Sequence, residues 1–145
     1  MSGSAARHAW LIGASTGMGL EVGRLLVMAG WQVTLSARST DILDRAARDI
    51  GATAVPLDVT DSAAVRTAAQ HLFATQPAEL VMINAGDYAP MPLEDFDSAL
   101  FERLNRVNYL GPVYVLGAVL PLLRDRGGGQ VLRSEERRVG KECRS

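Results

Sequence analysis

The sequence contains one cysteine and one lysine among 145 residues, and its 15 basic and 16 acidic side chains nearly cancel. One cysteine cannot form a disulfide within the chain, which points to a reducing compartment, the cytoplasm. A net charge of −1 gives no electrostatic basis for binding nucleic acid or an anionic membrane. No apolar run reaches the length of a membrane span, and the N-terminus lacks the apolar core of a signal peptide. We therefore expect neither a nucleic-acid partner nor a membrane partner.

Metal-ligating residues are also scarce. The two histidines, His8 and His71, are far apart in the sequence and have no acidic or cysteine neighbours at metal-ligand spacing. We expect no metal site, and we interpret both histidines and the two tryptophans, Trp10 and Trp31, as structural or surface residues. The content of 48% hydrophobic and 21% charged residues is close to that of an average globular domain.

The most informative motif is G-x-x-x-G-x-G, which follows the apolar run 9–12. The run predicts a buried parallel strand, and a helix is predicted after it, so the glycines lie where backbone N–H groups can bind a phosphate. Gly13 permits a tight turn, Gly17 permits close approach to a pyrophosphate, and Gly19 permits close packing of helix on strand. The remaining predicted cofactor-binding residues of this turn are Ser15, Thr16 and Met18.

Three more predicted strands end in polar or small residues. Residues 33–38 end in a cation, residues 54–59 end in Asp-Val, and residues 80–86 end in Asn-Ala-Gly. A fifth, short strand is predicted at residues 129–132. Helices are predicted between the strands. The first runs from Gly19 to a stop at Gly30, the second from Ser39 or Thr40 through Ile50, and the third over 62–74 with Asp61 as its cap. The fourth runs from about 97 to 123, and Pro112 and Pro121 can kink or break it.

This alternation predicts an α/β fold, a Rossmann-type doubly wound parallel sheet that ends after about the fifth strand. In such sheets ligands bind beyond the carboxyl ends of the strands, where the four motifs end. With these motifs together, residues 7–132 resemble the short-chain dehydrogenase/reductase family. The resemblance implies an NAD(P)-dependent oxidoreductase that transfers hydride between NADP(H) and a small carbonyl or alcohol substrate. It also implies that this sequence is the N-terminal part of a longer protein, and that the intact protein is a homo-oligomer.

The resemblance implies specific cofactor contacts. Arg38 stands where NAD-preferring relatives carry an acid, so its guanidinium would pair with the 2′-phosphate of NADP and make NAD the less favoured cofactor. The alternative is a solvated arginine at a strand end. Asp58 resembles the adenine contact, backed by Val59, and its alternative is an acid in the turn before a helix. Asn84 braces neighbouring strands, while the small Ala85 and Gly86 let a ribose lie against the backbone.

One catalytic residue is carried over from the family. Residues 104–111 resemble its asparagine-bearing helix, with Asn108 at the matching position, where the carboxamide would hold a water that relays protons. The alternative is an ordinary polar residue in a helix, although asparagine is a poor helix former. Asn105 is interpreted as a surface residue.

The family's serine, tyrosine and lysine have no match. Residues 133–136 read Arg-Ser-Glu-Glu where Asn-x-Ser-Ser would stand, and Ser134 does not align with the catalytic serine. The only lysine, Lys141, would need a tyrosine at Arg137. We therefore expect the chain as written to be inactive. A non-catalytic dinucleotide-binding fragment is the alternative, and a Rossmann-type methyltransferase is disfavoured by Arg38 and by the Asn-Ala-Gly sequence.

The last thirteen residues differ in composition from the rest. Residues 1–132 hold ten arginines and no lysine, whereas the only lysine and the only cysteine, Cys143, both lie in 133–145. This segment also resembles the translation of a common sequencing adapter. We expect a dinucleotide-binding unit over 1–132 and a non-native tail over 133–145, the alternative being a native basic tail.

Overall fold

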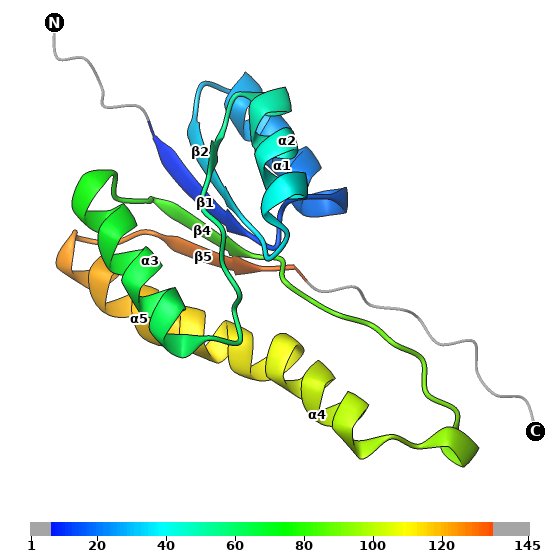
Figure 1. Ribbon diagram of the computed structural model, residues 1–145. Coiled ribbons are helices and arrows are strands. Elements are labelled where there is room, and N and C mark those ends of the chain that lie inside the picture. Colours follow the sequence, from blue (N-terminus) through cyan, green and yellow to red (C-terminus); the bar gives the residue numbers. More distant parts are fainter. Residues whose placement is uncertain (1–6, 135–145) are drawn as a thin grey trace, which may run out of the picture.

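The computed structural model describes residues 7–134 as five strands interleaved with helices (Figure 1). The strands are β1 (His8–Ile12), β2 (Gln32–Ser36), β3 (Thr53–Ala54), β4 (Leu80–Ile83) and β5 (Gln130–Arg133). The α-helices are α1 (Gly17–Met28), α2 (Thr40–Ile50), α3 (Ser62–Thr75), α4 (Ser98–Asn105) and α5 (Gly111–Asp125). A 3₁₀ turn, η1 (Leu93–Asp95), precedes α4, and a π-helical segment, η2 (Arg106–Leu110), joins α4 to α5.

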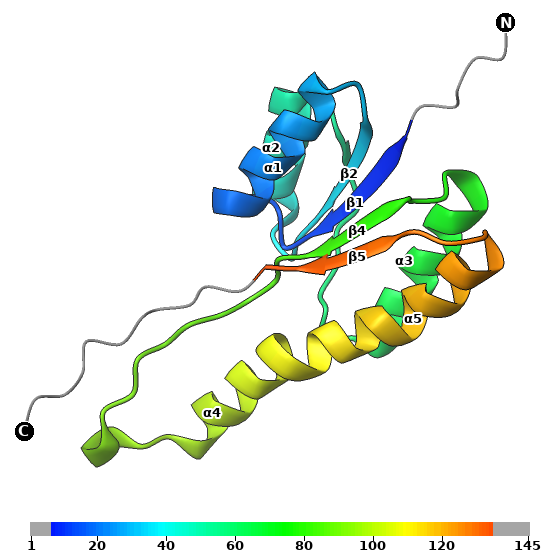
Figure 2. The same ribbon diagram turned by 180° about the vertical axis from the view of Figure 1, so that it is seen from behind.

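All strands are parallel, in the order β3-β2-β1-β4-β5. Helices α1 and α2 cover one face of the sheet, and α3 and α5 cover the other (Figures 1 and 2). Strand β1 lies at the centre and alternates between two cores, with Trp10 and Ile12 in the core under α3 and α5, and Ala9 and Leu11 in the core on the other side. The predicted doubly wound parallel sheet is confirmed.

Helix boundaries follow the predicted signals. Asp61 caps α3, and its carboxylate accepts hydrogen bonds from the backbone N–H groups of Ala63 and Ala64 at 3.0 and 2.9 Å. Gly51 ends α2 in the left-handed conformation, at a φ of +76°. Ser39 is the N-cap of α2, but its hydroxyl makes no capping hydrogen bond.

The predicted strand 54–59 is wrong over most of its length, because only Thr53 and Ala54 pair as strand with β2. Pro56 has no N–H group to donate to a ladder, and β3 lies at the sheet edge where proline is tolerated. The chain still follows β2, since the N–H groups of Val55 and Leu57 donate to the carbonyls of Leu35 and Ala37 at 2.9 and 3.0 Å.

The single helix predicted over 97–123 is divided by the π-helical segment η2. In a regular helix the residue at 112 would donate its N–H to the carbonyl of Asn108, but Pro112 has none. The Asn108 carbonyl instead accepts a hydrogen bond from Nη2 of Arg133 at 2.6 Å. The α-helical hydrogen-bond pattern is therefore not maintained at Asn108, the predicted catalytic residue.

The end of β5 extends beyond the predicted boundary. Arg133 pairs with Ile83 of β4, and the N–H of Ser134 donates to the Ile83 carbonyl at 3.1 Å. The first residue of the segment predicted to be non-native thus continues the strand. Residues 135–145, including Arg137, Lys141 and Cys143, lie outside the described residues.

One stretch departs from the expectation that no apolar run reaches membrane-spanning length. Within residues 7–134, the continuous helical stretch Ser98–Asp125 is long and apolar enough to cross a membrane, judged by length and composition alone. Its inner side chains Val107, Val115 and Val119 are buried against the sheet. A core helix of a folded domain passes the same test, so the stretch is weak evidence for a membrane span.

His8 and Trp10 are structural, as predicted. The Nδ1–H of His8 donates to the carbonyl of Gln76 at 2.6 Å, and its Nε2 accepts from the Thr34 hydroxyl at 2.9 Å. These roles follow because a carbonyl oxygen can only accept. The indole of Trp10 donates to the Ser36 hydroxyl at 2.9 Å. Burial lowers the pKa of His8, against the smaller opposing effect of the Gln76 hydrogen bond.

Candidate functional site

The carboxyl ends of β1, β2 and β4 surround a pocket of about 350 Å³. It lies where ligands bind in open parallel sheets. The pocket is lined by Gly13, Ser15, Thr16, Ala37, Arg38, Ser39, Leu57, Asp58, Val59, Asn84, Ala85, Gly86 and Val107. The structure therefore brings together most of the predicted cofactor-binding residues. Of the predicted site residues, Gly17, Met18, Gly19 and Asn108 are not part of this lining.

The glycine turn forms one wall of the pocket. Gly13 has a φ of +78°, and a Cβ at this position would overlap the backbone of Ala85. Gly17 also has a positive φ, +59°, and has open space beside it, as close approach of a ligand would require. Thr16 is the N-cap of α1 and makes no capping hydrogen bond with its side chain.

Gly19 allows helix and strand end to pack closely, as predicted. A Cβ on Gly19 would lie 2.7 Å from the Nδ2 of Asn84 and 3.0 Å from the Cα of Ala14. Met18 is about half exposed and lies in the first turn of α1, outside the pocket lining. Its predicted cofactor contact stays a prediction.

Arg38 lies on the pocket wall directly after β2, followed by Ser39 at the start of α2. Its side chain is exposed, and it makes no ion pair or hydrogen bond with any residue in the described range 7–134. Both of the sequence interpretations, a solvated cation and a phosphate ligand, fit this position. The guanidinium keeps all its N–H groups available for an anion in the pocket.

Asp58 combines the two roles considered for it. Its Oδ1 accepts hydrogen bonds from the backbone N–H and the hydroxyl of Thr60 at 2.9 and 2.8 Å, which is the turn role. The same side chain lines the pocket, and within residues 7–134 its Oδ2 has no hydrogen-bond partner. Val59 is buried behind it, close enough to Gly111 that a Cβ there would lie 2.8 Å from Cγ2 of Val59.

Asn84 joins three strand ends. Its Nδ2 donates to the carbonyl of Gly13 at 2.8 Å, and its Oδ1 accepts from the hydroxyl of Ser134 at 2.6 Å. The predicted bracing role is confirmed. Ala85 and Gly86 follow without side-chain bulk and form part of the pocket lining.

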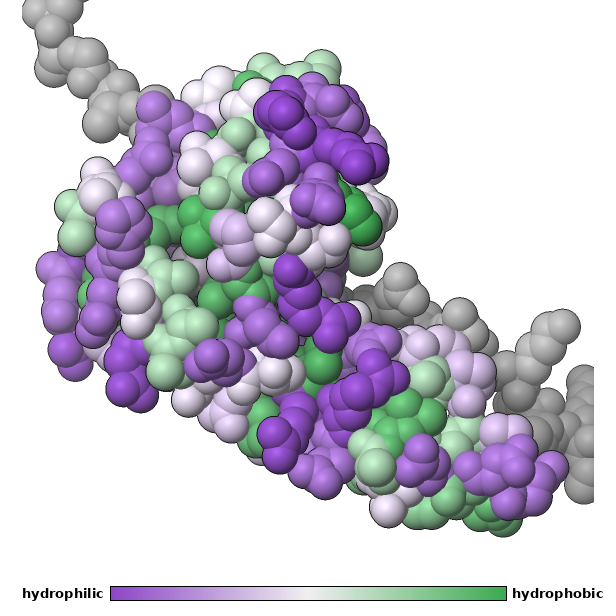
Figure 3. Space-filling model, in the orientation of Figure 1, coloured by the Kyte–Doolittle hydropathy of each residue, from purple (hydrophilic) through white to green (hydrophobic). Residues whose placement is uncertain are grey.

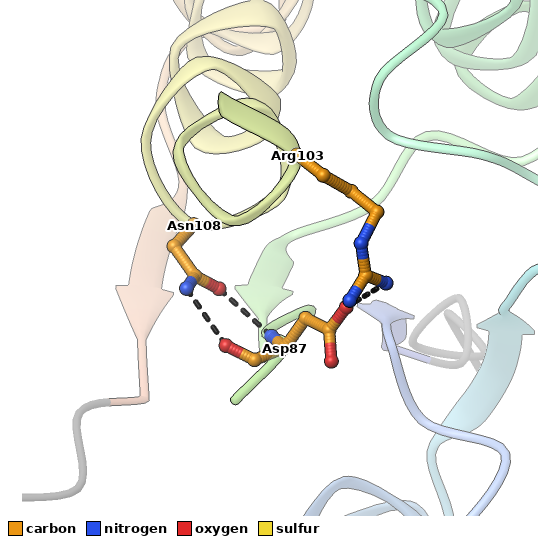
Figure 4. Close-up of polar contacts among 3 residues, drawn as sticks. All are labelled: Asp87, Arg103 and Asn108. Atoms are coloured by element: carbon orange, nitrogen blue, oxygen red, sulfur yellow. Dashed lines mark hydrogen bonds and ion pairs between the residues drawn. The ribbon is translucent and has the colours of Figure 1, made fainter. Parts of the chain in front are cut away.

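The side chain of Asn108 forms hydrogen bonds with the main chain of Asp87, which follows Gly86 in the loop after β4 (Figure 4). Its Oδ1 accepts from the Asp87 N–H, and its Nδ2 donates to the Asp87 carbonyl, both at 2.8 Å. The Asp87 carboxylate in turn pairs with Arg103 of α4 at 2.7 Å. The carboxamide of Asn108 is thus occupied by protein partners, and its predicted role of holding a relay water remains a prediction. Each carboxamide atom keeps capacity for one more hydrogen bond.

Comparison with known proteins identifies the family. The model of the short chain dehydrogenase family matches residues 7–134. The chain belongs to the short-chain dehydrogenase family. Galactitol 2-dehydrogenase (L-tagatose-forming) of Cereibacter sphaeroides is 30% identical over 123 residues, covering 83% of this chain and 48% of the relative. Sulfoacetaldehyde reductase 2 of Chromohalobacter salexigens is 34% identical over 126 residues, covering 82% and 50%.

The solved structures agree. A short-chain dehydrogenase from Streptomyces avermitilis superposes with a TM-score of 0.81 at 30% identity, over 89% of this chain and 49% of that protein. The chain therefore spans about half the length of these three proteins. Members of the family are oxidoreductases that bind NAD(P) and act on small carbonyl or alcohol substrates.

Sequence reasoning missed several residues of this short-chain dehydrogenase site. Ala37, Ser39, Leu57 and Val107 line the pocket. All four adjoin predicted site residues, so including the neighbours of each motif would have found them. Asp87 and Arg103 carry no local signal, since they are 16 residues apart and meet only through the packing of α4 beside the loop after β4.

Proposed function

We propose that the pocket binds NADP(H) in preference to NAD(H). The observation that carries the proposal is Arg38, an exposed cation on the pocket wall with no acidic partner among residues 7–134. A carboxylate at the end of β2 would repel a 2′-phosphate, whereas a guanidinium forms charge-assisted hydrogen bonds with it.

The remaining lining residues suit the other parts of the dinucleotide. The N–H groups at the start of α1 and the hydroxyls of Ser15 and Thr16 would bind the pyrophosphate. The free oxygen of Asp58 would accept a hydrogen bond from the adenine amine. The surface formed by Ala85 and Gly86 would lie against a ribose. NADPH supplies the hydride in such reactions, and this chain's residues would bind and orient it.

The whole protein, of which the chain spans about half, would transfer hydride between NADP(H) and a small carbonyl or alcohol substrate. We place it in the cytoplasm, consistent with a single cysteine. The 145-residue chain alone would bind the dinucleotide without reducing a substrate, because it has no Tyr-x-x-x-Lys sequence. Asn108 is the one family catalytic residue that it carries, and its proposed contribution is to the proton relay.

The whole protein would be a homo-oligomer. Large apolar side chains lie exposed along α4, η2 and α5, and hydrophobic surface is visible around α4 in Figure 3. These exposed side chains are Phe101, Tyr109, Val113 and Leu120. Exposed apolar surface of this kind marks a protein interface, and a second copy would cover it.

Direct titration tests the cofactor proposal. Isothermal titration calorimetry of the purified chain with NADPH and with NADH should give a lower dissociation constant for NADPH. Tighter binding of NADH would contradict the preference, and no binding of either dinucleotide would contradict the site itself. A matched titration with 2′,5′-ADP, which differs from 5′-AMP only by the added 2′-phosphate, should show tighter binding than 5′-AMP.

A further inference from the structure

Arg103 forms an ion pair with Asp87, a residue beside the proposed cofactor pocket. Asp87 follows Gly86, the last pocket-lining residue of the loop after β4. Asn108 holds the main chain of Asp87 at both its N–H and its carbonyl, but leaves its side chain unconstrained. The guanidinium of Arg103 forms an ion pair with the Asp87 carboxylate at 2.7 Å (Figure 4). Two neighbouring turns of one helical stretch therefore fix both the backbone and the charge of Asp87.

We propose that Arg103 is a positioning residue for cofactor binding, which neutralises Asp87 and turns its carboxylate away from the dinucleotide pocket. The inference rests on the proposed function, because it presumes that a polyanionic dinucleotide binds beside Gly86. The side chain of Asp87 is 23% exposed, so its charge is partly shielded from solvent and acts at short range. Without Arg103 that charge would lie unbalanced one residue from the pocket and repel the cofactor.

The chain offers a matched control pair. Arg106 pairs with Glu102 at 3.0 Å on the same helical stretch, and both side chains are more than half exposed. Within residues 7–134 the side chains of this pair form no hydrogen bond or ion pair with the loop after β4, and neither residue lines the pocket. Arg103→Met and Arg106→Met each remove one positive charge of the same type from adjacent turns. A difference between them therefore isolates the contact with Asp87 from the loss of net charge.

The experiment measures NADPH dissociation constants of the full chain and its variants, with the thermal unfolding midpoint of each. We expect Arg103→Met to weaken NADPH binding about twofold to fivefold, the range of partly exposed ion pairs. Arg106→Met should leave the dissociation constant unchanged. Adding Asp87→Asn to Arg103→Met should restore wild-type affinity, because the unbalanced charge is gone. A purely structural role would not give this restoration, since the double variant also lacks the ion pair.

Three results would overturn the inference: Arg103→Met binding NADPH like the wild type, equal weakening in Arg106→Met, or no restoration by Asp87→Asn. If Arg103→Met fails to fold, Arg103→Lys keeps the charge and should bind within about twofold of the wild type. A larger loss in that folded variant would also contradict the role. Failure of the wild type to bind NADPH refutes the proposed function instead, so the two failures are distinguishable.

Discussion

Asn84 donates its Nδ2 hydrogen to the carbonyl of Gly13 at 2.8 Å and so ties the end of β4 to the glycine turn after β1. The same Nδ2 lies 2.7 Å from the position that a Cβ on Gly19 would take. The glycine turn is therefore held from outside by a residue 71 positions away. This arrangement requires that Gly19 has no side chain.

We expect Gly19→Ala to lower the free energy of unfolding by about 1–3 kcal/mol, the cost of overpacking a fitted site. The added methyl would lie 2.7 Å from Asn84 Nδ2 and 3.0 Å from Ala14. Gly117→Ala is the control, because Gly117 is also helical but a Cβ there meets nothing within 4 Å. That control should be stabilised by about 0.5–1 kcal/mol. Urea unfolding of both variants tests this, and equal effects would contradict the steric reason.

Arg38→Ala should weaken NADPH binding and leave NADH binding nearly unchanged. A hydrogen-bonded charge pair with the 2′-phosphate contributes about 1.5–3 kcal/mol, or about tenfold to 150-fold in the dissociation constant. Arg45→Ala removes an exposed arginine from α2 outside the pocket and serves as the charge control. Equal weakening of NADPH and NADH binding would show that Arg38 has a structural role instead.

Stability should fall as the pH drops below about 6.5, the usual pKa of histidine. Burial lowers the pKa of His8 in the folded protein, so below this pH the unfolded chain binds more protons than the folded one. The stabilisation present above pH 6.5 is then lost progressively until the lower folded pKa is reached. One proton gives a slope of at most about 1.4 kcal/mol per pH unit. Urea midpoints between pH 7.5 and 5.5 measure it, and the His8→Gln variant should show a flatter dependence.

The chain as written should reduce no ketone or aldehyde. General acid catalysis contributes about 10²–10⁴-fold to such rates, and the sequence offers no Tyr-x-x-x-Lys pair to supply it. NADPH oxidation measured by absorbance over a panel of carbonyl compounds should equal a protein-free blank. Turnover by pure protein, abolished in Asn108→Ala, would refute the expectation.

The sequence by itself determined the architecture of this protein. Alternating apolar strands and capped helices predicted the doubly wound parallel sheet, because burial on both faces requires continuous apolar runs such as that of β1. The strand-end motifs also predicted most of the pocket lining, since the carboxyl ends of parallel strands meet at one edge. The start of α3 at Asp61 and the end of α2 at Gly51 depend only on residues close in the sequence.

Only the tertiary structure decided what joins segments distant in sequence. Packing of α4 and η2 beside the loop after β4 brings Arg103 and Asn108 onto Asp87. The π-helical segment arises where Pro112 removes one donor and Arg133, from a distant strand, supplies another. Such contacts carry no periodic signal, because each side chain's partner is set by how whole elements pack. Apolar periodicity and capping signals report only on a residue's own element.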